Sequence, residues 1–153
     1  MKWVTRERPK VDRIACPWLI RRFIDPEAEI LYVPAGDVLE VAAREGGHSF
    51  DAAGATYSHR RQPGGQWCTF ETLIDEYSLG VDPALVRLAA IVHAADIADD
   101  VDTHPFGAAL RAIGDAGARV EEDDQRLLTR ASFVYDALYA YCQKAVPVEM
   151  DVP

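Results

Sequence analysis

Two imidazoles and two carboxylates in this sequence are spaced so that they can share one metal ion. His93 and Asp96 lie three residues apart in a segment with helical periodicity, which places both side chains on one helix face. His59 lies in a loop-like stretch, and Glu71 falls in the first turn of the next predicted helix. Imidazole nitrogens and carboxylate oxygens suit Zn, Fe or Mn, and such a set leaves a coordination position for water. We therefore predict a divalent transition-metal site at His59, Glu71, His93 and Asp96.

Each of these residues also has an ordinary structural interpretation. Asp96 can accept a hydrogen bond from His93 or begin the last turn of its helix. Glu71 can simply interact favourably with the dipole of the helix that it begins. Cys68 is a further candidate ligand, although a lone cysteine is more often a small buried residue. Spacing alone favours these structural interpretations.

A second constellation, between residues 12 and 25, offers a different chemistry. It contains three arginines and one cysteine: Arg13, Arg21, Arg22 and Cys16. Guanidinium groups match tetrahedral oxyanions well, so the arginines are candidates for binding a small oxyanion. The cysteine precedes Pro17 near a predicted helix N-terminus, where the dipole can lower a thiol pKa, and it is therefore a redox candidate. The alternative is that the arginines pair with nearby acids and that the cysteine packs inside.

No signature of a known catalytic machinery accompanies these residues. The sequence contains no nucleophile elbow, no P-loop and no glycine fingerprint for a dinucleotide. No catalytic residue is therefore assigned, and the sequence does not decide between a metal-binding protein and a metal-dependent enzyme.

Composition limits the classes of partner. The chain has 153 residues with 49% apolar and 27% charged residues, which is typical of one globular domain. Its formal net charge is −9, which disfavours nucleic acid as a partner because phosphate binding needs a positive surface. Three distant cysteines without metal or disulfide spacing, no signal-like N-terminus and no long apolar run predict a cytoplasmic protein that does not span a membrane.

Alternating β-rich and helical segments predict a small sheet in the N-terminal part. Strands are expected at residues 2–5, 29–33 and 48–50, with helices in residues 12–24 and 37–44 between them. Such crossovers imply at least one parallel strand pair. We expect Asp12 to cap the first helix, and Pro17 to be tolerated only if that helix begins close to it.

The rest of the chain is predicted to be mainly helical. Residues 52–67 are expected to form a loop, and helices are expected to begin at residues 69, 83, 107 and 123 or 124 and to end near residues 80, 96, 113 and 144. The result is an α/β to α+β fold, with a small N-terminal sheet followed by a mainly helical C-terminal half. Residues 1–146 are expected to form one domain and residues 147–153 a tail. Aromatic residues on the last helix can cover either the core or the face of a homodimer, the core being commoner.

Four segments resemble those of a known family. They are KWVTRERPKVDRIACPWLIRRFIDPEAEILYVP at residues 2–34, CTFETLIDEY at 68–77, IVHAADIADD at 91–100 and FVYDALYAYC at 133–142. Together they resemble the C-terminal domain of ChrB-type chromate resistance proteins, and the resemblance covers nearly the whole chain.

The resemblance implies a role in the response to chromate or oxidative stress. It also implies a recurring pattern of the family, which includes the positions of His59, Glu71, His93 and Asp96 and the run that contains Arg13, Cys16 and Trp18. Longer relatives carry an additional N-terminal region and are described as chromate-sensing regulators. The matching segment here begins at Lys2, so we expect this chain to act without that region. A metal-binding protein or metal-dependent enzyme is the first hypothesis, and an oxyanion sensor or accessory module with an Arg/Cys surface is the alternative.

Overall fold

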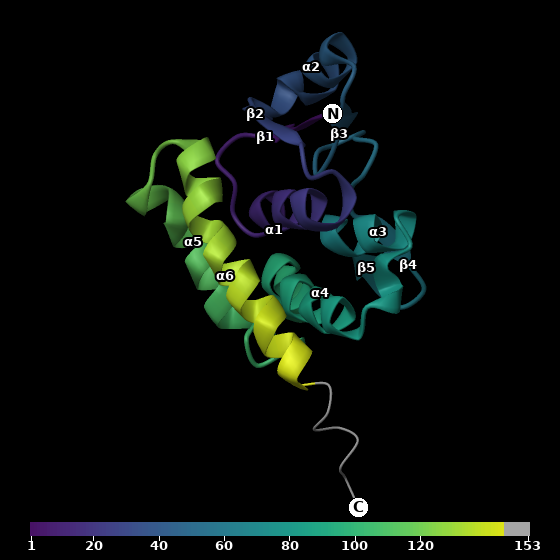
Figure 1. Cartoon of the computed structure of the whole chain (residues 1–153), viewed down its shortest axis with the longest axis vertical. Coiled ribbons are helices and arrows are strands. Elements are labelled where there is room, and N and C mark those ends of the chain that lie inside the picture. Colours follow the sequence, from purple (N-terminus) through teal and green to yellow (C-terminus); the bar gives the residue numbers. More distant parts are fainter. Residues whose placement is uncertain (146–153) are drawn as a thin grey trace, which may run out of the picture.

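The computed structural model describes residues 1–145, and it divides into a sheet-containing N-terminal part and a helical remainder (Figure 1). The strands are β1 (Lys2–Arg6), β2 (Glu29–Val33), β3 (His48–Ser49), β4 (Arg60–Gln62) and β5 (Gly65–Trp67). The α-helices are α1 (Asp12–Leu19), α2 (Val38–Glu45), α3 (Thr69–Glu76), α4 (Pro83–Asp96), α5 (Gly107–Val120) and α6 (Asp124–Ala145). Short helical segments are η1 (Ile20–Ile24), η2 (Ala35–Asp37), η3 (Leu79–Val81) and η4 (Ala98–Thr103). The predicted tail lies outside the described residues.

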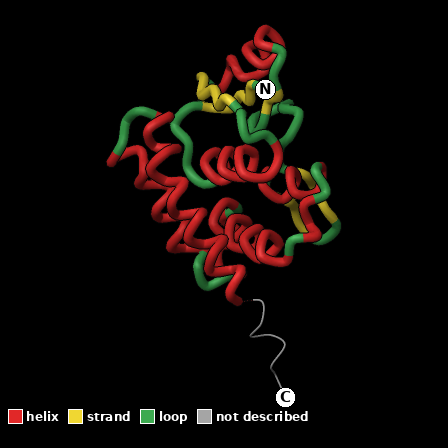
Figure 2. The backbone as a smooth tube through the Cα atoms, viewed as in Figure 1, coloured by secondary structure: helices red, strands yellow, loops and turns green. Residues whose placement is uncertain are grey.

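The N-terminal part is a three-stranded parallel sheet with a helix on either side. β1 is the central strand, and it pairs in parallel with β2 on one edge and β3 on the other. Successive side chains of a strand point to opposite faces, so Val4 packs beneath α2 while Trp3 enters the main core with α1. β1, β2 and β3 lie with α2 at one end of the molecule in Figures 1 and 2, and α1 lies beneath them. The predicted parallel sheet and the α+β fold are confirmed.

The first helix begins at the start of its predicted range, but Pro17 lies in its interior and not in its first turn. α1 runs from Asp12 to Leu19, and the polypeptide continues as a π-helical turn in η1. A proline has no N–H to donate to the carbonyl four residues earlier, which here belongs to Arg13. The hydroxyl of Tyr32, on β2, donates to this carbonyl instead at 2.6 Å. A partner from a neighbouring strand thus replaces the missing intrahelical hydrogen bond.

The stretch predicted as a loop, residues 52–67, contains a β-hairpin. β4 and β5 pair antiparallel, with Gln62 opposite Gly65 at the tight end. Pro63 and Gly64 form the turn, and Gly64 has φ of 82°, a conformation that glycine adopts without strain. The hairpin lies beside α3 and follows His59 directly.

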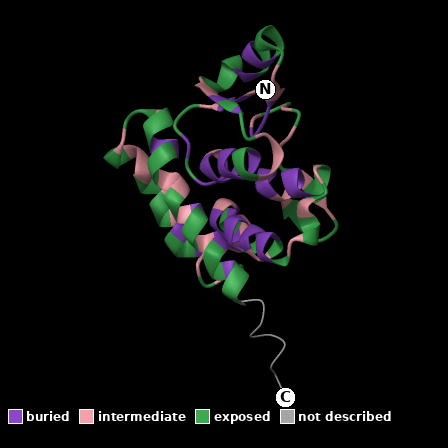
Figure 3. Ribbon diagram, viewed as in Figure 1, coloured by how far each residue is buried: buried purple, intermediate pink, exposed green. Residues whose placement is uncertain are grey.

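The helical half packs around α4. The carboxylate of Asp82 caps this helix by accepting hydrogen bonds from the N–H groups of Ala84 and Leu85 at 2.9 and 3.2 Å. α4 then runs from Pro83 to Asp96, as predicted. It and α1 carry mostly buried residues, whereas α5 and α6 expose much of their surface (Figure 3).

α5 extends seven residues beyond its predicted end at Ile113, although Gly114 and Gly117 lie in its interior. A Cβ on Gly114 would come within 2.7 Å of the side chain of Val11, so the glycine permits close packing against the chain before α1. Packing therefore outweighs the weak helix propensity of glycine here.

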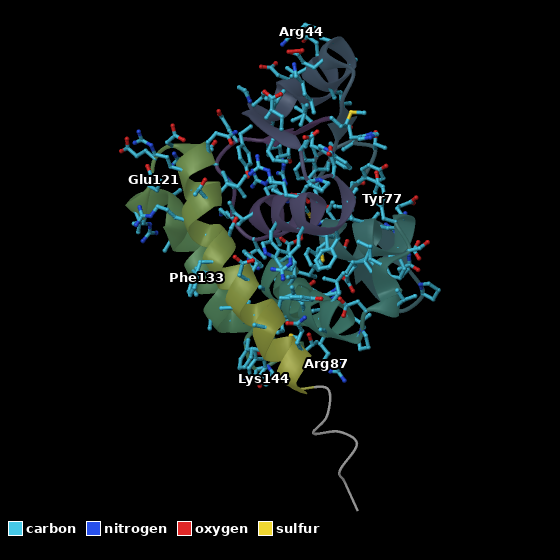
Figure 4. The ribbon with its side chains drawn as sticks, viewed as in Figure 1. Arg44, Tyr77, Arg87, Glu121, Phe133 and Lys144 are labelled. Atoms are coloured by element: carbon cyan, nitrogen blue, oxygen red, sulfur yellow. The ribbon has the colours of Figure 1, made fainter. Side chains whose placement is uncertain are left out.

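Aromatic residues of α6 divide between the core and the surface. Tyr135 and Tyr139 are buried against α1, as expected for core residues. Phe133 is 72% exposed, and Figure 4 shows it at the outer face of the molecule. Among the helices of residues 1–145, none is both long enough and apolar enough to cross a membrane.

Candidate metal centre

The four predicted ligands are distributed between two neighbouring clusters. One, here called the His59 cluster, consists of Asp12, His59 and Asp96; the other, the His93 cluster, consists of Cys68, Glu71 and His93. Within each cluster, the potential ligand atoms lie within 4.8 Å of one another. The structure thus brings His59 to Asp96 and Glu71 to His93, and each pair gains a partner from elsewhere in the chain.

Three helices, α1, α3 and α4, position the two clusters. His93 and Asp96 lie one turn apart on α4, so one helix face contributes to each cluster. Cys68 and Glu71 lie at the start of α3, which is joined to α1 because the N–H of Thr69 donates to Oδ2 of Asp12 at 2.8 Å. Both clusters therefore contact the N-terminus of α3.

His59 is surrounded by carboxylates. Its Nε2 lies 3.0 Å from Oδ2 of Asp96, 3.5 Å from Oδ2 of Asp12 and 3.5 Å from Oδ1 of Asp51. Hydrogen bonds with Asp12 and then with Asp96 raise the pKa of His59 to about 10, so the imidazole is a cation in the metal-free chain. The pKa of Asp12 is raised well above its usual value, first by burial and then by the negative charge of Asp96.

Asp51 lies beside the His59 cluster and contacts it through His59. Its Oδ1 accepts a hydrogen bond from the hydroxyl of Thr69 at 2.7 Å. Its Oδ2 lies 3.2 Å from Nη2 of Arg6 and 3.4 Å from Nε of Arg13. Two guanidinium groups therefore balance the charge of Asp51, whereas His59 is the only cationic side chain that the structure records in an ion pair with Asp12 or Asp96 among residues 1–145.

One oxygen of Asp12 has no partner. Asp12 is 1% exposed, and Oδ2 binds Thr69 and His59, but Oδ1 is buried without a hydrogen bond. A buried carboxylate oxygen without a partner is costly, because it has lost water and gained nothing in exchange. This is the arrangement that a bound cation or a proton would relieve.

His93 lies between two carboxylates. Its Nδ1 is 2.5 Å from Oε1 of Glu71, and its Nε2 is 2.6 Å from Oδ2 of Asp100. Burial by itself lowers the pKa of His93, but the hydrogen bonds with Glu71 and Asp100 outweigh burial and raise it. The N–H of Cys68 also donates to Oε1 of Glu71, at 3.0 Å, and this bond holds the carboxylate over the start of α3.

Each cluster borders an open pocket. A pocket of about 310 Å³ is lined by His59, Asp51, Arg6, Ser58 and residues 52–54. A larger pocket, of about 580 Å³, has apolar walls from α3, η3 and α4, and Glu71 is one of its polar residues. Pockets of this size accommodate small molecules.

Comparison with known proteins establishes the family. Residues 3–142 match the family model described as ChrB, C-terminal domain. The chain belongs to this family. It is 37% identical over 143 residues to Protein ChrB of Cupriavidus metallidurans, and the match covers 92% of this chain and 40% of that protein. The chain therefore spans less than half the length of this curated relative. No solved structure matches it significantly.

In this ChrB C-terminal domain, the three arginines predicted to bind an oxyanion have separate partners. Arg13 donates to the carbonyls of Arg6 and Glu7 as well as pairing with Asp51. Nε of Arg21 donates to the carbonyl of Ala28 at 3.1 Å. Nη1 of Arg22 pairs with Asp136 at 3.0 Å, and its guanidinium lies 4.9 Å from the ring of Tyr139. These bonds disfavour a shared oxyanion site.

Cys16 is packed inside this ChrB C-terminal domain. Its exposure is 0%, and burial followed by the negative charge of Asp12 raises the pKa of its thiol well above the usual value. A thiol that is both protonated and shielded reacts slowly, because the thiolate is the reactive form. The structure therefore disfavours Cys16 as a redox centre. Cys68, the thiol near the predicted metal ligands, is equally buried, and burial followed by the negative charge of Asp12 raises its thiol pKa as well.

Three carboxylates of this domain were not among the predicted ligands: Asp12, Asp51 and Asp100. Asp12 was predicted to be a helix cap, but α1 has no side-chain cap and the carboxylate reaches α3 instead. Asp51 lies just after β3, and its φ of 49° is an uncommon value for a residue other than glycine. Asp100 lies in an acidic run, where sequence alone does not distinguish a solvated charge from one that meets His93.

Proposed function

We propose that this chain binds a divalent transition-metal ion through Asp12, His59 and Asp96, and that it acts as a metal-binding protein or metal-dependent enzyme in the response to chromate or oxidative stress. The observation that carries the proposal is the buried carboxylate of Asp12. One of its oxygens has no partner, and the other lies beside His59.

The electrostatics of the His59 cluster favour a cation. Three carboxylates lie within 3.5 Å of one imidazole nitrogen, and only Asp51 is also paired with arginine. In the metal-free chain the proton on His59 supplies the compensating charge. A divalent ion would supply more charge and would let the imidazole act as a neutral ligand.

The donor set indicates which ions fit. One imidazole nitrogen with two carboxylate oxygens suits Fe and Mn, and zinc also accepts such a set. When bound, such an ion acts as a Lewis acid or lowers the pKa of a water molecule. Thr69 would hold the carboxylates of Asp12 and Asp51 in place, because it donates to both. The pocket that reaches His59 gives a small molecule access to this cluster.

Metal content tests the proposal. The protein, purified from cells supplied with Fe, Mn and Zn, is expected to hold an ion that is lost in His59→Gln and in Asp96→Asn. The matched controls are His104→Gln and Asp99→Asn, since Asp99 is exposed and neither residue belongs to the cluster. The same four variants, expressed in a chromate-sensitive cell, should separate in the same way by growth on chromate.

Two results would contradict the proposal. The first is a wild-type protein that holds less than about a tenth of an equivalent of every transition metal and does not take one up on titration. The second is a metal content that is equal in the site variants and in their controls. If metal binds but all variants protect cells from chromate equally, the metal site stands and the role in chromate resistance falls.

A further inference from the structure

Cys68, Glu71 and His93 bring three different ligand types to one point. The thiol of Cys68, the carboxylate of Glu71 and the imidazole of His93 have their ligand atoms within 4.8 Å of one another. Cys68 immediately precedes α3, Glu71 lies in its first turn, and His93 is presented by α4. The thiol distinguishes this set from the His59 cluster, which offers only carboxylate oxygens and an imidazole nitrogen.

The orientation of His93 is the second observation. Its Nδ1 faces Glu71, while Oδ2 of Asp100 holds the opposite nitrogen, Nε2, at 2.6 Å. Imidazoles that bind metal commonly donate their other N–H to a carboxylate, which fixes the ring orientation and strengthens the ligand. Asp100 comes from η4, a separate segment from both helices, so the arrangement depends on the fold rather than on helical spacing.

The third observation is the space beside Glu71. This carboxylate is among the residues that line the apolar pocket of about 580 Å³ between α3 and α4. Only Glu71 of the three residues lines this pocket, so an exogenous ligand would approach the cluster from the side of Glu71. Three protein ligands are the number found in zinc sites that keep a fourth position for water or an exogenous ligand, whereas closed structural sites use four protein ligands.

We infer that Cys68, Glu71 and His93 form a second metal site, distinct from the His59 cluster, which takes a thiophilic ion such as zinc. Asp100 is the positioning residue that orients His93. The thiolate sets the preference for zinc over manganese or magnesium, because soft ligands favour soft ions. The domain would then carry two ions of different character, both near the N-terminus of α3.

Cobalt(II) in place of zinc tests this inference, because a thiolate ligand gives cobalt an intense charge-transfer band in the near ultraviolet. The metal-free full chain, kept reduced with a phosphine, is titrated with Co²⁺ and then with Zn²⁺. We expect the sulfur-to-cobalt band to appear in wild type and in the control Cys142→Ser, and to be absent in Cys68→Ser. Zn²⁺ should remove the band by displacing cobalt.

Further variants separate this site from the His59 cluster. Asp100→Asn should keep the band but weaken zinc binding about 10–100-fold, as loss of an orienting carboxylate does. Its side chain is 38% exposed, so this substitution is compatible with folding. His59→Gln should lose one equivalent of metal and keep the band, which distinguishes a failure at one site from a failure at the other.

The inference is overturned by either of two results. One is cobalt binding in wild type without a sulfur-to-cobalt band, or no cobalt binding at all. The other is a band that persists in Cys68→Ser, which would assign the thiolate to another cysteine. If Cys68→Ser does not fold, as judged by circular dichroism, then His93→Gln takes its place, and an undiminished zinc affinity in that variant or in Asp100→Asn would contradict the second site.

Discussion

At the scale of single residues, the chemistry of this domain depends on carboxylates that meet imidazoles. His59 and His93 each lie within hydrogen-bonding distance of a carboxylate from a different segment of the chain. These contacts raise the pKa of both imidazoles, because a nearby negative charge stabilises the protonated ring. In the metal-free chain, protons on His59 and His93 therefore occupy the positions at which we propose that metal ions bind.

One consequence is that metal affinity at the His59 cluster should rise with pH. His59 has a pKa of about 10 in the metal-free chain, so at neutral pH each bound ion must displace its proton. We expect manganese affinity to rise about tenfold per pH unit between about pH 6.5 and 8.5, with about one proton released per ion. An unperturbed histidine would already be neutral over most of this range.

Calorimetric titration in two buffers of different ionisation enthalpy measures this proton release. Asp99→Asn serves as the control, because this exposed carboxylate should change neither the affinity nor the number of protons released. If the manganese affinity changed by less than about tenfold between about pH 6.5 and 8.5, no proton would be displaced from His59 on binding.

At the scale of the elements, α1 shows how a neighbouring strand can complete a helix. Pro17 removes one hydrogen bond from the interior of α1, and the hydroxyl of Tyr32 on β2 supplies the replacement at the carbonyl of Arg13. This bond joins the sheet to the helix that carries Asp12. The position of one proposed metal ligand is thus coupled to the packing of α1 against β2.

Tyr32→Phe should therefore destabilise the fold. Loss of the hydroxyl leaves the carbonyl of Arg13 without this donor, and losing such a part-buried hydrogen bond costs about 0.5–1.5 kcal/mol. Pro17→Ala should offset much of this loss in the double variant, because alanine has an N–H that can donate to the same carbonyl. Urea unfolding of the wild type, both single variants and the double variant gives the coupling free energy.

One result of these unfolding experiments would contradict the proposed role of Tyr32. Strictly additive effects of Tyr32→Phe and Pro17→Ala would mean that the two substitutions do not act on a shared carbonyl. Tyr141→Phe is a suitable control for loss of a tyrosine hydroxyl, since Tyr141 is 56% exposed on α6 and lies far from α1 in sequence.

At the scale of the whole molecule, the His59 cluster joins segments that are distant in the sequence. Asp12 comes from α1, His59 from the loop before β4, and Asp96 from the end of α4. Because the unfolded chain does not hold these groups together, an ion that binds them must stabilise the folded state. The site is therefore also a link between the sheet-containing part and the helical part.

Metal binding should raise resistance to unfolding. At a free-ion concentration of a hundred times Kd, the expected stabilisation is about 2.7 kcal/mol. Thermal or urea unfolding with and without metal measures this gain. His59→Gln should lose the part of the gain that depends on the His59 cluster, and Cys68→Ser should lose the part that depends on the His93 cluster. An equal gain in wild type and in both variants would indicate non-specific binding.

The sequence by itself determined the family, the α+β class, the parallel sheet and the bounds of α4, because these depend on local signals. Proline, glycine and capping residues mark the element ends, and apolar periodicity marks the faces that must be buried. His93 and Asp96 were also recognisable from spacing, since one helix turn separates them.

The grouping of the candidate ligands follows from tertiary packing and not from the sequence pattern. The sequence suggested one set of four, whereas the fold places two of them with Asp12 and the other two with Cys68. The sequence has 25 acidic residues, and it does not show which of them are buried and which are solvated. It therefore could not single out Asp12, Asp51 and Asp100. Their partners are up to 84 residues away in the chain, as with Asp12 and Asp96, and contacts of that range arise from packing rather than from local pattern.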